Sequence, residues 1–270
     1  MEPDGVVGTL KLRGVLFDLD GTIYEHGIEL PGAARAVRAL RDRGLQVGFV
    51  TNTTSRSRRL LTERLHGMGI ETDPGHISTA LRAGAAHLRA AGFTRVSALV
   101  PEAALEDLAE FEVGGPRPQA VVVGDLDDQW TFEILNTAFR QLMDGAELVA
   151  LSVDRYWQKD DGLVLDCGPF VKALEYASGR TAAVCGKPSA EFYRAALASL
   201  GPWALENPGS VLMVGDDVWG DIRGAQEAGL RACLVRTGKF RDEVFAGCGV
   251  APDWLIADVR ELELTLAPHA

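Results

Sequence analysis

Residues 14–22 read Gly14-Val15-Leu16-Phe17-Asp18-Leu19-Asp20-Gly21-Thr22, an apolar run that ends in two aspartates and a glycine. Short, continuously apolar runs are typical of strands that are buried on both faces of a parallel sheet. The glycine favours a turn directly after the second aspartate. The stretch therefore predicts a central strand over 14–20 that delivers two carboxyl groups to one edge of a sheet.

Four further apolar runs fit strands of the same sheet, and helical patterns lie between them. The predicted strands are 14–20, 45–52, 182–187, 210–217 and 231–238. The predicted helices are 31–43, 55–68 with Ser55 as N-cap, 189–200 and 220–228. Strands that alternate with helices indicate a doubly wound, Rossmann-like parallel α/β domain.

The middle of the chain repeats this alternation on a smaller scale. Its predicted strands are 96–100, 120–125, 148–153 and 163–166, and its predicted helices are 129–144 and 168–178. We therefore expect a core domain made of residues 1–78 and 182–270, with a smaller α/β domain, residues 79–181, inserted into it.

The composition of the chain limits which partners and which cellular location we expect for it. The 270 residues have a net charge of −11, which argues against a nucleic-acid partner or an anionic membrane surface. No apolar run approaches the length of a membrane span, and the N-terminal segment does not resemble a signal peptide. The four cysteines, Cys167, Cys185, Cys233 and Cys248, show no C-x-x-C spacing, which favours a reducing, cytoplasmic setting.

Acidic side chains at the ends of the predicted strands indicate a metal site. Asp18 and Asp20 lie at the end of the first predicted strand, and Asp216 lies at the end of the fourth. Ligands bind at the carboxyl ends of the strands in open α/β sheets, so these groups should meet there. Their negative charges would repel one another without a cation, and hard carboxylate and carbonyl oxygens suit Mg²⁺. The expected cofactor is therefore Mg²⁺.

The same edge collects groups suited to phosphoryl transfer. Asp18 can act as the nucleophile, and Asp20 can act as the general acid and base. Thr51, Asn52 and Lys187 could complete a shell of donors and positive charge around a phosphoryl group. Two further acids, Asp217 and Asp221, follow Asp216. Asp217 is expected to support the metal ligands without binding the ion itself. Asp221 either has the same role or only interacts favourably with the dipole at the N-terminus of its helix.

Four motifs in this order resemble those of the haloacid dehalogenase (HAD) superfamily. They are Phe17–Thr22, Val50–Asn52, Gly186–Pro188 and Val214–Asp217. The resemblance implies a nucleophile at Asp18, an acid/base at Asp20, phosphate contacts from Thr51 and Asn52, and charge neutralisation by Lys187. It also implies that Mg²⁺ is held by Asp18, the main-chain carbonyl of Asp20, and Asp216.

The position of the inserted domain indicates which subgroup of the superfamily this chain resembles. It lies between Asn52 and Lys187, where a class II cap domain would be inserted. Residues 76–80, 154–157, 161–163, 168–170 and 236–239 are similar to stretches of the subclass IIA phosphatases. This implies a Mg²⁺-dependent phosphatase that acts on a small phosphate ester, with a homodimer through the cap.

The residues of the predicted site are also compatible with further functions. Two animal members of the subclass, one of which acts on phosphohistidine, phospholysine and pyrophosphate, have Ser where this chain has Asp20. A carboxylate there favours an ordinary phosphomonoesterase, because Ser cannot serve as a general acid in the same way. A dehalogenase that attacks carbon, a phosphoacceptor switch and a catalytically weak regulatory or scaffold protein are the remaining candidates.

Overall fold

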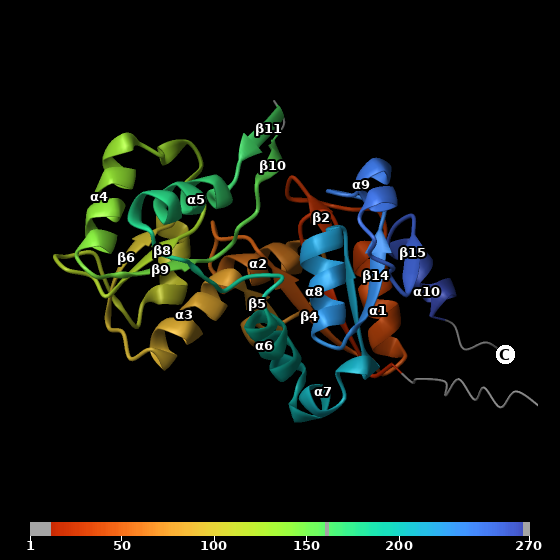
Figure 1. Ribbon diagram of the computed structural model, residues 1–270. Helices are drawn as coiled ribbons and strands as arrows, with labels where there is room; N and C mark the ends of the chain where they lie inside the picture. Colours follow the sequence, from red (N-terminus) through yellow and green to blue (C-terminus); the bar gives the residue numbers. More distant parts are fainter. Residues whose placement is uncertain (1–11, 160–161, 267–270) are drawn as a thin grey trace, which may run out of the picture.

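The computed structural model describes residues 12–159 and 162–266, which form two parallel sheets with helices packed on both faces of each (Figure 1). In this part of the chain, no helix has both the length and the apolar character that crossing a bilayer requires. The predicted fold class, a doubly wound α/β core with an inserted α/β cap, is confirmed.

The core sheet has six parallel strands in the order β15-β14-β13-β1-β4-β5. The central strand β1 pairs with β4 on one side and β13 on the other, and all five of its residues are buried. The strand bounds are β1 Gly14–Asp18, β4 Gln46–Thr51, β5 Ile77–Thr79, β13 Val211–Gly215, β14 Arg231–Val235 and β15 Trp254–Ile256.

Helices cover both faces of this sheet because successive strand side chains point to opposite sides. Val15 and Phe17 pack with α1, α2 and α10, whereas Leu16 packs with α6, α7 and α8. The helix bounds are α1 Ala33–Asp42, α2 Arg58–Gly67, α6 Ala190–Leu200, α7 Pro202–Glu206, α8 Gly224–Glu227, α9 Asp242–Gly247 and α10 Leu262–Thr265. A short hairpin, β2 Tyr24–Glu25 and β3 Ile28–Glu29, follows β1.

The cap is built around a second parallel sheet of order β12-β9-β8-β6-β7, with α3 on one face and α4 and α5 on the other. An antiparallel hairpin, β10–β11, projects from it (Figure 1). The bounds are α3 Ala80–Ala90, β6 Arg95–Leu99, β7 Glu112–Val113, β8 Ala120–Val123, α4 Phe132–Met143, β9 Glu147–Ala150, β10 Tyr156–Lys159, β11 Gly162–Leu165, α5 Cys167–Ser178 and β12 Ala183–Val184.

Two predictions about individual elements are wrong. Residues 182–187 do not form a core strand, because β12 pairs with β9 in the cap sheet, and β5 takes the place beside β4. An apolar composition indicates a buried strand but not which sheet it joins. The N-cap of α2 is Ser57, whose hydroxyl accepts the Leu60 N–H, and not Ser55. The division of the chain at 79 and 181 stays a prediction.

Polar contacts join the start of α2 to the cap. Asp107, from the helical turn Glu102–Leu108, accepts the main-chain N–H of Arg58 at 2.9 Å and pairs with its guanidinium at 3.3 Å. Glu106 accepts the Ser57 hydroxyl at 2.8 Å and pairs with Arg59 at 3.2 Å. Cap carboxylates therefore satisfy donors at the N-terminus of a core helix, where free N–H groups favour anions.

Candidate active site

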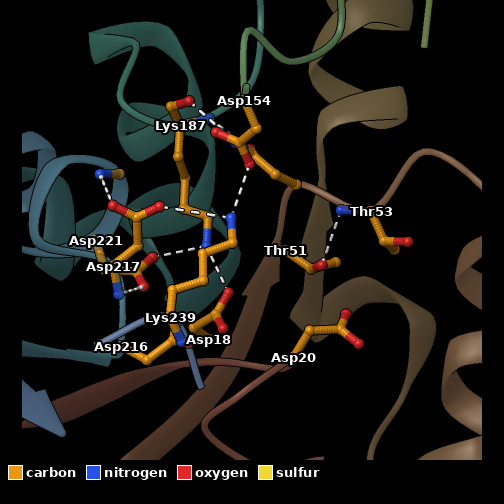
Figure 2. Close-up of polar contacts among 12 residues, drawn as sticks. Asp18, Asp20, Thr51, Thr53, Asp154, Lys187, Asp216, Asp217, Asp221 and Lys239 are labelled. Carbon is orange, nitrogen blue, oxygen red and sulfur yellow. Dashed lines mark hydrogen bonds and ion pairs between the residues drawn. The ribbon is translucent and has the colours of Figure 1, made fainter. Parts of the chain in front are cut away.

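The candidate site lies at the carboxyl edge of the core sheet, between that sheet and the cap (Figure 2). Asp18 is the last residue of β1, Thr51 is the last residue of β4, and Asp216 follows β13. Because β1 pairs with both β4 and β13, these three strand ends meet as expected. The close approach of Asp216 to the loop after β1 requires Gly21, since a Cβ there would collide with the Asp216 carboxylate.

Lys187 connects two acids of the site. Its Nζ lies 2.5 Å from Asp18 Oδ1 and 2.6 Å from Asp221 Oδ1, and all three side chains are buried. Burial opposes the ammonium charge most strongly, but the carboxylates of Asp18 and Asp221 hold the Lys187 pKa well above its ordinary value. Lys187 therefore remains a cation beside the predicted nucleophile.

Three carboxylates lie close enough to share a metal ion. One oxygen from each of Asp18, Asp216 and Asp221 lies within 4.8 Å of the other two. Burial is the main cause that raises the pKa of all three, to about 7 for Asp221, and repulsion from Asp18 adds to it for Asp216. When all three carboxyl groups are ionised, they and the Lys187 cation together have a net charge of −2. This group therefore fits a divalent cation that prefers oxygen ligands.

The hydrogen bonds of the three acids show that they are not equally suited to bind a metal ion. Both oxygens of Asp221 are occupied, one by Lys187 and the other by the main-chain N–H of Asp217 at 3.0 Å. Asp216 accepts the main-chain N–H of Lys239 through Oδ2 at 2.6 Å, and Asp18 contacts Lys187 through Oδ1. The second oxygens of Asp18 and Asp216 are thus better placed to bind an ion, whereas Asp221 orients Lys187.

Asp20 stands apart from the three clustered acids (Figure 2). Asp20 is exposed, and the Tyr24 hydroxyl donates to its Oδ2 at 3.4 Å. The surrounding protein removes the carboxyl partly from water and so raises its pKa, although Arg64, Lys187 and Lys239 oppose this. A raised carboxyl pKa and an accessible carboxyl group suit a proton donor.

Thr51 and Asn52 differ in the hydrogen bonds that their side chains form. Thr51 Oγ1 accepts the Thr53 main-chain N–H at 2.9 Å, so its own hydroxyl hydrogen can donate to a ligand. The Asn52 amide accepts the Lys187 N–H at 2.8 Å and donates to the Lys187 carbonyl at 3.1 Å and to Ser152 Oγ at 3.4 Å. The side chain of Asn52 therefore holds the main chain of Lys187 in place.

Comparison with known proteins identifies the superfamily. A family model described as "Haloacid dehalogenase-like hydrolase" matches residues 15–114, and a second HAD hydrolase model matches residues 184–262. Haloacid dehalogenase-like hydrolase domain-containing protein 2 from Bos taurus is 42% identical over 230 residues, which cover 85% of this chain and 86% of the relative. The chain belongs to the haloacid dehalogenase-like hydrolases.

Further relatives of this HAD hydrolase are named as phosphatases. Phospholysine phosphohistidine inorganic pyrophosphate phosphatase from Rattus norvegicus is 37% identical over 236 residues, 85% of each chain. The solved structure of p-nitrophenyl phosphatase from Archaeoglobus fulgidus matches with a TM-score of 0.87 and 29% identity over 95% of this chain and 100% of that one. The predictions of a subclass IIA HAD protein and of a HAD-type phosphatase are confirmed.

Residues 237–239 also belong to the site of this HAD phosphatase, although the sequence alone indicates no role for them. Thr237 donates its hydroxyl to the Gly21 carbonyl, and the Lys239 main-chain N–H holds Asp216. The Lys239 ammonium lies 3.0 Å from Asp154 of the cap. Residues 236–239 and 154–157 resemble the subclass, but no local pattern indicates that Lys239 and Asp154 meet.

Proposed function

We propose that this phosphatase hydrolyses a small phosphate monoester with the help of Mg²⁺, and that Asp18 forms a transient aspartyl-phosphate. The supporting observation is the buried contact between Asp18 and the Lys187 ammonium, next to the acid cluster with Asp216. A carboxylate beside a fixed cation can attack a phosphate group whose own negative charge would otherwise repel it.

In the first half of the reaction, an oxygen of Asp18 attacks phosphorus, and the bond between phosphorus and the ester oxygen breaks. The ester oxygen leaves with the electron pair and takes a proton from Asp20, whose raised pKa favours the protonated form. Lys187 stays in place and balances charge on the phosphoryl oxygens. The Thr51 hydroxyl donates to one of those oxygens.

In the second half, Asp20 accepts a proton from a water molecule whose oxygen attacks the same phosphorus. The bond between phosphorus and Asp18 breaks, which restores the carboxylate and releases inorganic phosphate. Mg²⁺ held by Asp18, the Asp20 main-chain carbonyl and Asp216 would supply positive charge against the phosphate oxygens. Asp217 and Asp221 support this shell, the latter by orienting Lys187.

Release of phosphate from p-nitrophenyl phosphate, with and without EDTA, tests the proposal. Asp18→Asn should lower kcat by about 100-fold or more, because the amide is a poor nucleophile. An acid-quenched reaction with ³²P-labelled substrate should leave label on the wild-type protein that hydroxylamine removes. The exposed Asp42→Asn variant is the control. More than a few per cent of wild-type activity in Asp18→Asn would contradict the mechanism.

A second candidate is hydrolysis of P–N or pyrophosphate bonds, which the name of the rat relative suggests. Against it stands Asp20, since a carboxylic acid is most useful to a poor alkoxide leaving group. A panel with phosphohistidine, phospholysine, pyrophosphate and several phosphate monoesters distinguishes the candidates by kcat/KM. A regulatory or scaffold protein without catalysis predicts no turnover of any panel member at micromolar enzyme.

We further propose a homodimer formed through the cap. Phe132 of α4 is 83% exposed and Tyr176 of α5 is 94% exposed, and both lie on the outer helical layer of the cap. Large exposed apolar side chains favour an interface. Sedimentation equilibrium should show a dimer that Phe132→Ser/Tyr176→Ser dissociates, whereas Leu264→Ser on the core does not. A monomeric wild-type protein contradicts this proposal.

We also propose a cytoplasmic location. All four cysteines are free, and Cys167, Cys185 and Cys233 are buried. Burial raises the pKa of Cys185 and Cys233 to about 12, so both stay as unreactive thiols. Cell fractionation, with an assay of phosphatase activity in each fraction, tests this location.

A further inference from the structure

The segment Thr237–Lys239 is anchored on the loop that follows β1 and on Asp216. The Thr237 hydroxyl donates to the Gly21 carbonyl at 2.5 Å, and the Lys239 main-chain N–H donates to Asp216 Oδ2 at 2.6 Å. Gly238 has a φ of +56° and lies so close to Asp216 and Gly21 that a Cβ would collide with both. Three consecutive residues therefore fix this segment against a predicted metal ligand.

The side chain of Lys239 leaves that anchor and reaches the cap. Its Nζ lies 3.0 Å from Asp154 Oδ2 and 3.5 Å from Asp217 Oδ2, as the dashed contacts of Figure 2 show. The side chain of Lys239 is 44% exposed, whereas that of Asp154 is 22% exposed. One residue thus contacts a metal-site carboxylate through its main chain and a cap carboxylate through its side chain.

Asp154 is itself held in place within the cap. Its main-chain N–H donates to Ser152 Oγ at 3.1 Å, and its carbonyl accepts the Gly168 N–H at 3.0 Å. Gly168 is required because a Cβ there would collide with the main chain of residues 153–154. Ser152 Oγ also accepts the Asn52 amide at 3.4 Å. The cap loop that presents Asp154 is therefore fixed on the cap side and touches the core at Asn52.

We propose that Lys239 is a positioning residue for hydrolysis, which aligns the cap loop 152–154 over the phosphoryl site through its ion pair with Asp154. The inference rests on the proposed phosphatase site, in which Asp20 gives a proton to the leaving group. Holding reacting groups in place lowers the barrier even where the holding contact adds little stability. A partly exposed ion pair contributes little to folding, so the effect belongs to the reaction and not to the fold.

A double-mutant cycle with p-nitrophenyl phosphate tests the coupling. Asp154→Asn and Lys239→Met should each lower kcat/KM by about tenfold, and the double variant should lose no more than the less active single variant. Lys239→Met keeps the main-chain N–H on Asp216, so the Mg²⁺ concentration for half-maximal activity should stay within about twofold of wild type. Lys239→Arg should recover activity to within about threefold of wild type.

A matched control is Arg59→Met, which removes another ion pair between core and cap, the 3.2 Å contact with Glu106. Its kcat/KM should stay within about twofold of wild type. An equal loss in Arg59→Met would overturn the inference, because general docking of the cap would then explain it. Multiplicative losses in the cycle, or a loss confined to Lys239→Met, overturn it too, since Lys239 would then act without Asp154. Failure of the proposed function is distinct: wild type would show no turnover, or Asp18→Asn would keep it.

Discussion

Lys187 Nζ lies 2.5 Å from Asp18 Oδ1, although 169 positions of sequence separate the two residues. The lysine comes from the connection between the cap strand β12 and the core helix α6, and the aspartate ends the central core strand. Asn52 fixes the main chain of Lys187 through two hydrogen bonds. The segment that connects the cap to the core therefore holds the Lys187 ammonium next to the predicted nucleophile.

Removing this cation should impair both catalysis and folding. We expect Lys187→Met to lower kcat/KM by about 100-fold or more, because the phosphoryl oxygens lose a fixed positive charge. The buried carboxylates of Asp18 and Asp221 would lose their partner, so the free energy of unfolding should fall by about 3–5 kcal/mol. Urea unfolding in EDTA measures this change.

Two variants check the cause of the lost stability. Lys187→Met/Asp221→Asn should recover part of it without recovering activity, because one uncompensated carboxylate is gone. Lys172→Met removes an exposed contact with Glu175 and should change the unfolding free energy by no more than about 1 kcal/mol. A double variant as unstable as the single one would show that charge repulsion is not the cause.

Mg²⁺ should stabilise the folded protein. Asp18 and Asp216 are buried near each other, and a bound cation would relieve their repulsion. A ligand present at about 100 times its Kd adds about 2.7 kcal/mol of stability, which predicts a higher Tm in Mg²⁺ than in EDTA. Asp216→Asn should abolish most of this shift. Asp217→Asn should keep it, because Asp217 accepts the N–H groups of Trp219 and Gly220 instead.

Local sequence was sufficient to predict that Asp18 and Asp216 meet at one edge of the core sheet, but not that cap residues join them there. Asp18 and Asp216 follow the core strands β1 and β13, and the pairing of those strands brings them together as predicted. The predicted core strand before Lys187 proved to belong to the cap sheet, because strand partners are chosen by contacts distant in sequence. The Lys239–Asp154 pair depends on how two separate sheets are placed, which no local pattern records.

Asp166 should make stability depend on pH. It is the N-cap of α5, and its carboxylate accepts the Cys167 N–H at 2.6 Å. Burial, together with the negative charges of Asp154 and Asp125, raises its pKa from 3.8 to about 6. The folded state therefore binds the proton more tightly than the unfolded state, so ionised Asp166 destabilises the fold at neutral pH. This penalty declines as the pH falls through 6.

Asp166→Asn should consequently be more stable than wild type at pH 7.5, and the difference should shrink at pH 5. The difference is at most about 3 kcal/mol, since one pKa unit corresponds to about 1.4 kcal/mol. Asn also caps helices well, so the cap is retained. Asp258→Asn is the control: Arg260 lowers the Asp258 pKa, so its contribution is lost only in more acidic solution and stays constant across this range. Equal differences at both pH values in Asp166→Asn would contradict the assignment.

Substitutions at Gly238 and Gly69 distinguish the effect of main-chain strain from the effect of a collision with Asp216. Both have positive φ, +56° and +75°, so main-chain strain alone should cost about 1–2 kcal/mol of stability for Ala at either position. At Gly238 the new Cβ would collide with Asp216 and Gly21, whereas at Gly69 no described residue other than its chain neighbours lies within 4 Å of it. Gly238→Ala should therefore also lower kcat/KM by about 100-fold and raise the Mg²⁺ concentration for half-maximal activity. Gly69→Ala should keep wild-type kinetics. Urea unfolding and Mg²⁺ titrations of activity compare the pair, and identical kinetics in the two variants would show that Asp216 does not depend on the Thr237–Lys239 segment.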